Sequence, residues 1–288
     1  MDTFNYELKQ LCKHNRDGSF ATRADRERLL DLIANQLKDM GFRHMHATSF
    51  KAKHVDALVE RWRGEGIACG TFKNRMSALR WVCEKTGKSQ LIAPSNDAYG
   101  IARRVYVSAT SKAWTLEESH LERIRCRYTA MSLRLQEAFG LRREESIKIV
   151  PAAADLGDRL FLQASWTKGG RSREVPILTI EQRVILDQAK ALAAGGSLIP
   201  RTSSYIDQRN RFKAQCQRAG IRNVHGLRHQ YAQNRYQALT GWACPAQGGP
   251  SVKSLSSDQR AIDRSARHTI SNELGHARIS VVNVYCGR

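Results

Sequence analysis

The chain has 288 residues, of which 47 are Lys or Arg and 27 are Asp or Glu, so its net charge near pH 7 is +20. Its length allows two ordinary domains or one large one, and 41% hydrophobic residues is normal for a folded protein. No apolar run approaches the roughly 20 residues of a membrane span, and the first residues lack the apolar stretch of a signal peptide. We therefore expect a cytoplasmic protein without a membrane partner, whose charge attracts nucleic acid.

The first 87 residues are predicted to be mostly helical. Three segments repeat apolar residues at the spacing of one helix face. The first has Thr22 as its N-cap and Gly41 as its stop, the second begins at a cap on Ser49, and the third covers about 70–87. Their apolar faces are formed by Leu29, Leu30, Ile33, Leu37 and Met40, by Val55, Leu58, Val59 and Trp62, and by Phe72, Met76, Leu79 and Val82.

Basic residues mark the outer face of the third segment and the stretch that follows it. Residues 88–114 contain Pro94, Gly100 and many Ser, Asn and Thr without a sustained period, which indicates a linker. Basic residues on an exposed helix are most often simply solvated. In a chain this positive we nevertheless expect phosphate contacts from Lys73, Arg75, Arg80, Arg103 and Arg104. The predicted domains are 1–105, helical and DNA-binding with its linker, and 106–288.

The second domain is predicted to be mainly helical with one small antiparallel sheet. Thr115 and Glu118 fit a capping box at the start of a helix. Two short strands follow within 159–178, joined by a turn at Gly169 and Gly170. Seven widely spaced cysteines (12, 69, 83, 126, 216, 244 and 286) match neither a disulfide framework nor zinc-ligand spacing, so we expect free thiols and no metal or other cofactor.

Four segments of this domain, 139–146, 166–177, 224–232 and 273–285, together resemble the tyrosine recombinase (phage integrase) family. Their sequences are FGLRREES, WTKGGRSREVPI, VHGLRHQYA and ELGHARISVVNVY. The resemblance implies a helical, SAM-like core-binding domain before a catalytic domain. It also implies catalytic roles for Arg142, Lys168, His225, Arg228, His276 and Tyr285, with Glu145 and His229 in support and with Arg171 and Arg173 on DNA. Each residue alone has an ordinary structural explanation, but six matching types in one order are hard to obtain by chance.

The family's chemistry suits these residue types. A phenol is a weak nucleophile unless a base or nearby cations activate it. The resemblance implies that Tyr285 attacks a DNA phosphate and forms a 3′-phosphotyrosine bond, without metal or ATP. Two guanidiniums, Arg142 and Arg228, suit the charge of the transition state. His276 would be a further donor, His225 would exchange a proton with the tyrosine, and Lys168 would protonate the leaving 5′ oxygen.

The resemblance also implies a nucleoid-associated protein of bacterial or phage type and a set of partners, and it leaves alternatives open. The partners are a double-stranded recombination site, a homo-tetramer on paired sites that is a monomer when free, and accessory DNA-bending proteins, as in mobile elements. The alternatives are a type IB topoisomerase and a catalytically silent DNA-binding regulator. The interval between Arg228 and His276 is about twice that of short family members, and its extra stretch, about 240–265, is either a contact surface or an inert loop. Many relatives carry a helix beyond the tyrosine that couples subunits, whereas only three residues follow Tyr285. Either the extra stretch supplies this contact or the sequence has been shortened at its end.

Overall fold

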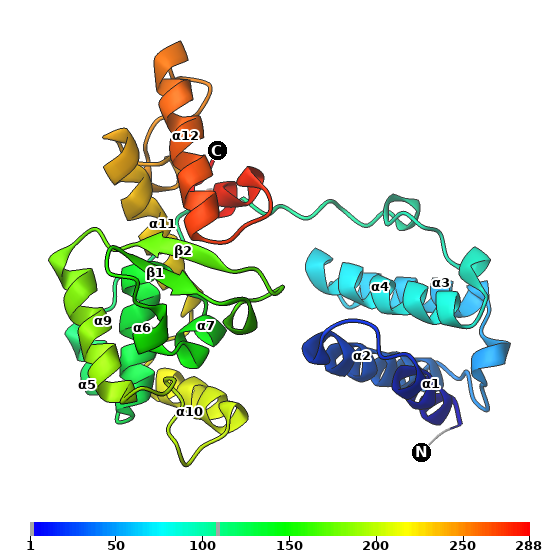
Figure 1. Cartoon of the computed structure of the whole chain (residues 1–288). Coiled ribbons are helices and arrows are strands. Elements are labelled where there is room, and N and C mark those ends of the chain that lie inside the picture. Colours follow the sequence, from blue (N-terminus) through cyan, green and yellow to red (C-terminus); the bar gives the residue numbers. More distant parts are fainter. Residues whose placement is uncertain (1–2, 108–109) are drawn as a thin grey trace. The chain divides into compact units, whose positions relative to one another are not determined.

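The computed structural model describes residues 3–107 and 110–288, which form two compact units, Met1–Val105 and Tyr106–Arg288 (Figure 1). The first unit is a helical bundle. Its helix α2 packs against α1, α3 and α4, and short 3-10 turns occupy Ala47–Ser49, Ser89–Leu91 and Asp97–Tyr99. The four helices are α1 (Thr3–His14), α2 (Phe20–Asp39), α3 (Ala52–Gly64) and α4 (Cys69–Lys85).

The apolar spacing of the first unit predicts its core. Leu30, Ile33 and Leu37 of α2 are buried, as are the four predicted residues of α3 and the four of α4. Leu29 and Met40 are only partly buried and pack at the edge of the core. An amphipathic helix buries one stripe of side chains, so residues at the margin of the stripe keep some exposure.

Three of the predicted helix caps are wrong. Helix α2 begins earlier than predicted, because Ser19 is its N-cap and accepts a hydrogen bond from the backbone N–H of Thr22 at 3.2 Å. Helix α3 begins after Lys51, and Ser49 instead ends a 3-10 turn. In the second unit, the first helix starts at Glu118 after the N-cap Glu117, so Thr115 does not cap it. An N-cap must have extended backbone and a free acceptor at the right residue, which several neighbouring side chains can satisfy equally well.

The second unit surrounds a larger apolar core with helices and one hairpin. Helix α6 packs against α7, α9 and α11, and α11 also contacts α12 and α13. The bounds are α5 (Glu118–Glu122), α6 (Arg127–Phe139), α7 (Arg143–Lys148), α8 (Pro151–Ala154), α9 (Ile180–Ala193), α10 (Tyr205–Arg218), α11 (His225–Thr240), α12 (Ser257–Glu273) and α13 (Asn283–Cys286). Further 3-10 turns occupy Ala164–Trp166, Pro245–Gln247 and Ile279–Val282. In the described ranges, no helix is both long and apolar enough to cross a membrane.

The predicted hairpin is present. Strands β1 (Arg159–Leu162) and β2 (Arg173–Pro176) are antiparallel, and Leu162 pairs with Arg173 while Leu160 pairs with Val175. Successive side chains of a strand point to opposite faces. Leu160, Leu162 and Val175 face the core, and so does Arg173, whereas Glu174 is exposed. The loop between the strands carries Lys168.

The interval at 240–265 packs into the domain. The 3-10 turn Pro245–Gln247 lies against the chain end, where a Cβ on Gly287 would come within 2.6 Å of the backbone nitrogen of Ala246. The segment then becomes helical, and Ser256 caps α12 with a capping box to Gln259. Figure 1 shows α11 and α12 side by side, with the short C-terminal helix near the end of α12. The interval therefore holds the segment that carries Tyr285.

Candidate active site

Tyr285 lies on α13 with its ring buried, and its hydroxyl meets two other candidate residues. Nε of Arg228 donates to the Tyr285 hydroxyl oxygen at 3.3 Å, and Nε2 of His225 lies 3.4 Å from the same oxygen. Both partners belong to α11, separated from Tyr285 by nearly 60 residues of chain. The backbone carbonyl of Tyr285 accepts a hydrogen bond from Gln233, also on α11, at 2.8 Å. The contact between α11 and α13 thus fixes both the backbone and the hydroxyl of the tyrosine.

Arg228 is almost fully buried, and its guanidinium is held by the backbone. Its terminal nitrogens donate to the carbonyl oxygens of Gly140 and Leu274, and one of them lies 3.5 Å from Nε2 of His276. Gly140 ends α6 with a positive φ of 59°, and a Cβ there would lie 2.6 Å from the Tyr231 ring. Burial lowers the pKa of Arg228 to about 10, so the group remains charged near neutral pH.

Arg142 is the N-cap of α7 and reaches the same cluster from another direction. Its Nη1 donates to Glu145 at 2.7 Å, and its Nη2 donates to the carbonyl of Leu274 at 3.3 Å. The Leu274 carbonyl therefore accepts from both Arg142 and Arg228. This shared acceptor at the end of α12 holds the two guanidiniums near each other, an arrangement that suits a bound phosphate.

Glu145 is completely buried beneath these arginines. Besides Nη1 of Arg142, it accepts the backbone N–H of Arg142 at 2.7 Å and two hydrogen bonds from Arg173 at 2.9 and 2.6 Å. Arg228 lies 4.0 Å away. Burial alone would raise the pKa of Glu145, but the hydrogen bonds and charge of Arg173, with Arg142 and Arg228, lower it to about 2. The carboxylate is therefore ionised at any pH at which the protein works.

Three histidine rings surround the Tyr285 ring. The distances between ring centroids are 4.6 Å for His229, 5.4 Å for His276 and 5.8 Å for His225. Burial, with the charges of Arg228 and Arg142, lowers the pKa of His225 to about 4 and that of His276 to about 3. Burial, followed by the charge of His225, lowers the pKa of His229 to about 4. All three are neutral near pH 7, so His225 can accept a proton from the phenol.

Lys168 is exposed in the loop between β1 and β2, and it lines the same cleft as Arg142 and His225. This cleft has a volume of about 420 Å³. The described residues give no hydrogen bond for the Lys168 ammonium group, which stands at the edge of the cluster. Sequence reasoning missed five other polar residues that line the cleft, Gln136, Arg143, Glu144, Arg222 and Asn223. Arg143 adjoins Arg142 and Arg222 precedes His225 by three residues, so their position next to matched residues was the available signal.

The basic residues predicted to contact DNA occupy different settings. Arg103, Arg104 and Arg171 are exposed, and Lys73 is half-buried on α4. Arg75 lies 5.3 Å above the Trp62 ring and 3.5 Å from Glu65, so most of its side chain is committed to the first unit. Arg80 donates to the carbonyl of Ala93 at 2.9 Å and is partly buried.

The assignment of Arg173 to DNA contact needs correction. Its side chain is only 5% exposed, and its three nitrogens donate to Glu145 and to the carbonyl of Glu273. The cause is the strand itself, because Arg173 occupies an inward-facing position of β2. The residue cannot reach a phosphate from there.

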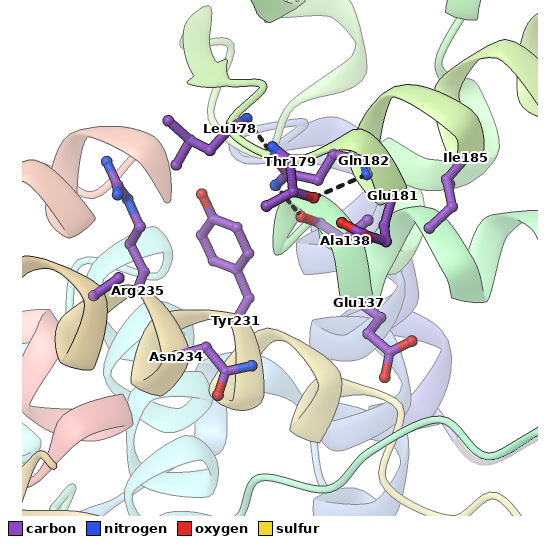
Figure 2. A pocket seen from close by; sticks show the side chains of 11 residues that line it. Glu137, Ala138, Leu178, Thr179, Glu181, Gln182, Ile185, Tyr231, Asn234 and Arg235 are labelled. Atoms are coloured by element: carbon purple, nitrogen blue, oxygen red, sulfur yellow. Dashed lines mark hydrogen bonds between the residues drawn. The ribbon is translucent and has the colours of Figure 1, made fainter.

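Another cavity, of about 520 Å³, lies between α6, α9 and α11 (Figure 2). Figure 2 shows Tyr231, Asn234 and Arg235 of α11 opposite Leu178 and Thr179, with Gln182 bonded to the carbonyl of Ala138. None of the six matched residues lines this cavity. In residues 3–107 and 110–288, no group of three His, Cys, Asp or Glu side chains could hold a metal ion. The polar groups that converge on one point are those around Tyr285.

Comparisons with known proteins identify the family of both domains. A family model described as the N-terminal domain of phage integrases matches residues 1–92, and an integrase model matches residues 107–234. A comparison with curated protein sequences finds no match. The chain belongs to the tyrosine recombinase (phage integrase) family.

Solved structures share the fold over the whole chain. The Tn1549 transposon integrase in complex with circular intermediate DNA is 13% identical with a TM-score of 0.58, covering 100% of this chain and 96% of the other. A lambda integrase dimer bound to a core site is 15% identical with a TM-score of 0.62, covering 97% and 76%. XerH recombinase bound to a palindromic difH substrate, in a post-cleavage complex, is 15% identical with a TM-score of 0.60, covering 98% and 80%. The predicted two-part architecture, a helical core-binding domain and a mainly helical catalytic domain with a small sheet, is confirmed.

Proposed function

We propose that the protein is a site-specific DNA recombinase that cleaves and rejoins DNA through a covalent bond between Tyr285 and a 3′ phosphate. The observation that carries the proposal is the position of the Tyr285 hydroxyl, which lies 3.3 Å from Arg228 and 3.4 Å from His225. A buried phenol between a cation and a neutral imidazole is placed to lose its proton to that imidazole.

The reaction follows from the contacts. The phenol proton passes to Nε2 of His225 as the tyrosine oxygen attacks the phosphorus atom. The bond from phosphorus to the 5′ oxygen breaks, and Lys168, from its exposed loop, gives a proton to that oxygen. Arg142 and Arg228 offer hydrogen bonds to the non-bridging oxygens, where negative charge increases, and His276 offers another. The reaction exchanges the phosphate ester of the 5′ oxygen for a phosphate ester of the tyrosine. Because the number of ester bonds is unchanged, a 5′ hydroxyl can reverse the step without ATP.

The partner that fits this chemistry is double-stranded DNA carrying two sites brought together by four subunits. One similar structure is of a lambda integrase tetramer bound to a Holliday junction, at 15% identity and a TM-score of 0.56, covering 96% of this chain and 77% of the other. A topoisomerase of related chemistry would reseal the strand it cut. Exchange of strands between two labelled duplexes separates these functions, because only a recombinase joins one duplex to the other.

The first experiment captures the covalent intermediate. In a library of nicked duplexes with a randomised core, the short fragment that bears the new 5′ hydroxyl diffuses away after cleavage, so the adduct accumulates and its DNA reports the preferred site. We expect adducts that resist SDS with the wild-type protein and none with Tyr285→Phe. The matched control is Tyr205→Phe on α10, whose hydroxyl is outside the cluster, and it should form adducts at the wild-type rate. Adducts that persist in Tyr285→Phe would contradict the assignment of the nucleophile.

A further inference from the structure

Arg173 is a buried arginine that the reaction described above does not use. It lies on β2 opposite Leu162 and faces the core, with 5% of its side chain exposed. A buried arginine is costly unless its charge is paired and its donors are satisfied. What it contacts therefore indicates its role.

All three guanidinium nitrogens of Arg173 have partners in the candidate active site. Two of them form a forked pair with the two oxygens of Glu145, at 2.9 and 2.6 Å. The third donates to the carbonyl of Glu273 at 2.8 Å, three residues before His276. Gly275 packs directly on the arginine, since a Cβ there would lie 2.7 Å from Cδ of Arg173.

The position of Glu145 gives this fork a consequence for charge. The carboxylate is fully buried, bonds Arg142 at 2.7 Å and lies 4.0 Å from Arg228. A buried carboxylate must be compensated by a nearby cation. Without a third arginine, Glu145 would draw on Arg142 and Arg228 and weaken the positive field at the phosphate. With Arg173 in a forked pair with Glu145, the positive charges of Arg142 and Arg228 are not compensated by this carboxylate and can act on the DNA phosphate.

We propose that Arg173 is a positioning residue that neutralises Glu145, so that Arg142 and Arg228 present two uncompensated positive charges to the scissile phosphate. Glu145 orients Arg142 by accepting both its backbone N–H and its side chain. Arg173 cancels the charge that this orientation introduces. Because Arg173 lies on the strand that follows the Lys168 loop, it also ties that loop to the two arginines. The inference rests on the proposed function, since it concerns the same phosphate.

The test measures the single-turnover rate of adduct formation on the nicked duplex selected by the wild-type protein. Arg173→Met leaves Glu145 charged beside Arg142, and we expect a rate about 100-fold lower, comparable to the loss of one donor to a transition-state anion. The double variant Glu145→Gln with Arg173→Met removes both charges of the pair. We expect it to be at least about 10-fold faster than Arg173→Met alone, because the neutral amide that replaces the carboxylate no longer competes for Arg142.

A double variant as slow as Arg173→Met or slower would overturn the inference. Because removing both members of a buried ion pair can also restore stability, the unfolding free energy of each variant is measured beside its rate, and rates are compared only where each protein is fully folded. Arg173→Lys keeps the charge without the forked pair, and its adduct rate should lie between those of the wild type and Arg173→Met. If Arg173→Met does not fold, the lysine variant provides the test. An Arg173→Lys protein that folds but cleaves as slowly as Arg142→Lys would also overturn the inference. The control is Arg183→Met, which removes an arginine that pairs with Asp155 outside the cluster and should leave the rate unchanged. Failure of the proposed function is distinct, since the wild-type protein would then form no adduct.

Discussion

At the scale of single residues, the proposed reaction depends on the protonation of His225. The imidazole lies at the edge of the cleft, yet its ring packs against His229, at 5.5 Å between centroids, and faces two guanidiniums. Its pKa is lowered to about 4, first by burial and then by Arg228 and Arg142. A base with a lowered pKa stays neutral at pH values where an ordinary histidine would be protonated.

This shift predicts an unusual pH dependence of cleavage. An ordinary histidine, with a pKa near ~6.5, would be about 90% protonated at pH 5.5, and a base of that kind would lose most of its rate. Because His225 remains neutral until the pH approaches 4, we expect the adduct rate to change by less than about twofold between pH 7.5 and 5.5. Single-turnover rates across this range check it, with His225→Gln as the control that lowers the whole profile. A midpoint near 6.5 in the wild-type profile would contradict the role of this histidine.

The same burial affects stability through His229, which is buried against Tyr285 and has a pKa lowered to about 4. Between about pH 6.5 and 4 the unfolded chain binds a proton at this position and the folded chain does not. Stability is therefore full above pH 6.5 and is lost as the pH falls toward 4. We expect the denaturant midpoint to fall between pH 7 and pH 5, and to fall less in His229→Gln. An equal fall in that variant would assign the loss to other groups.

At the scale of elements, the segment that carries Tyr285 is held by α12. Arg267 donates to Asp263 at 2.8 Å, to Asn283 of α13 at 2.8 Å and to the carbonyl of Gly287 at 3.0 Å. Tyr236 of α11 donates to the same Asp263 at 2.6 Å. The network joins the long interval after α11 to the last residues of the chain, which places Tyr285 beside Arg228 of its own subunit.

Replacing this anchor should slow cleavage without removing a catalytic group. Arg267→Met leaves Asp263 buried without its cation and α13 without its tie, so we expect a loss of about 3 kcal/mol in unfolding free energy. We also expect a clear fall in adduct rate with little change in DNA affinity. Arg260→Met, on the same helix but exposed, is the matched control. Wild-type cleavage by a folded Arg267→Met protein would show that the tyrosine is positioned by other contacts.

The sequence indicates these elements better than it indicates their partners. Apolar spacing predicts three of the four helices described in the first unit, α2, α3 and α4, but not α1. The sequence-based assignment of Arg173 to DNA contact is wrong, although the alternation of β2 indicated an inward position. Val175 faces inward, and residues two apart in a strand share a face. Pairing of Arg267 with Gly287, or of Glu145 with Arg173, joins distant parts of the chain. Such contacts depend on tertiary packing that no local pattern contains.

At the scale of the whole molecule, the charge of +20 belongs to two units that are each folded around their own core. Exposed basic residues occur in both, such as Arg103 before the second unit begins and Arg171 beside Lys168. Each cation that neutralises a DNA phosphate releases condensed counterions, and this release makes affinity depend on salt.

Salt titration tests which of these residues contact phosphates. If Arg103 and Arg171 each neutralise one phosphate, Arg103→Gln and Arg171→Gln should each reduce the slope of log affinity against log salt by about 1, and the double variant by about 2. The effects should add because the residues belong to different units. The double variant Glu145→Gln with Arg173→Met removes the buried pair without changing the net charge of the cluster, and it should leave the slope unchanged. A slope that falls for this double variant and not for Arg171→Gln would reverse the two assignments and return Arg173 to the DNA surface.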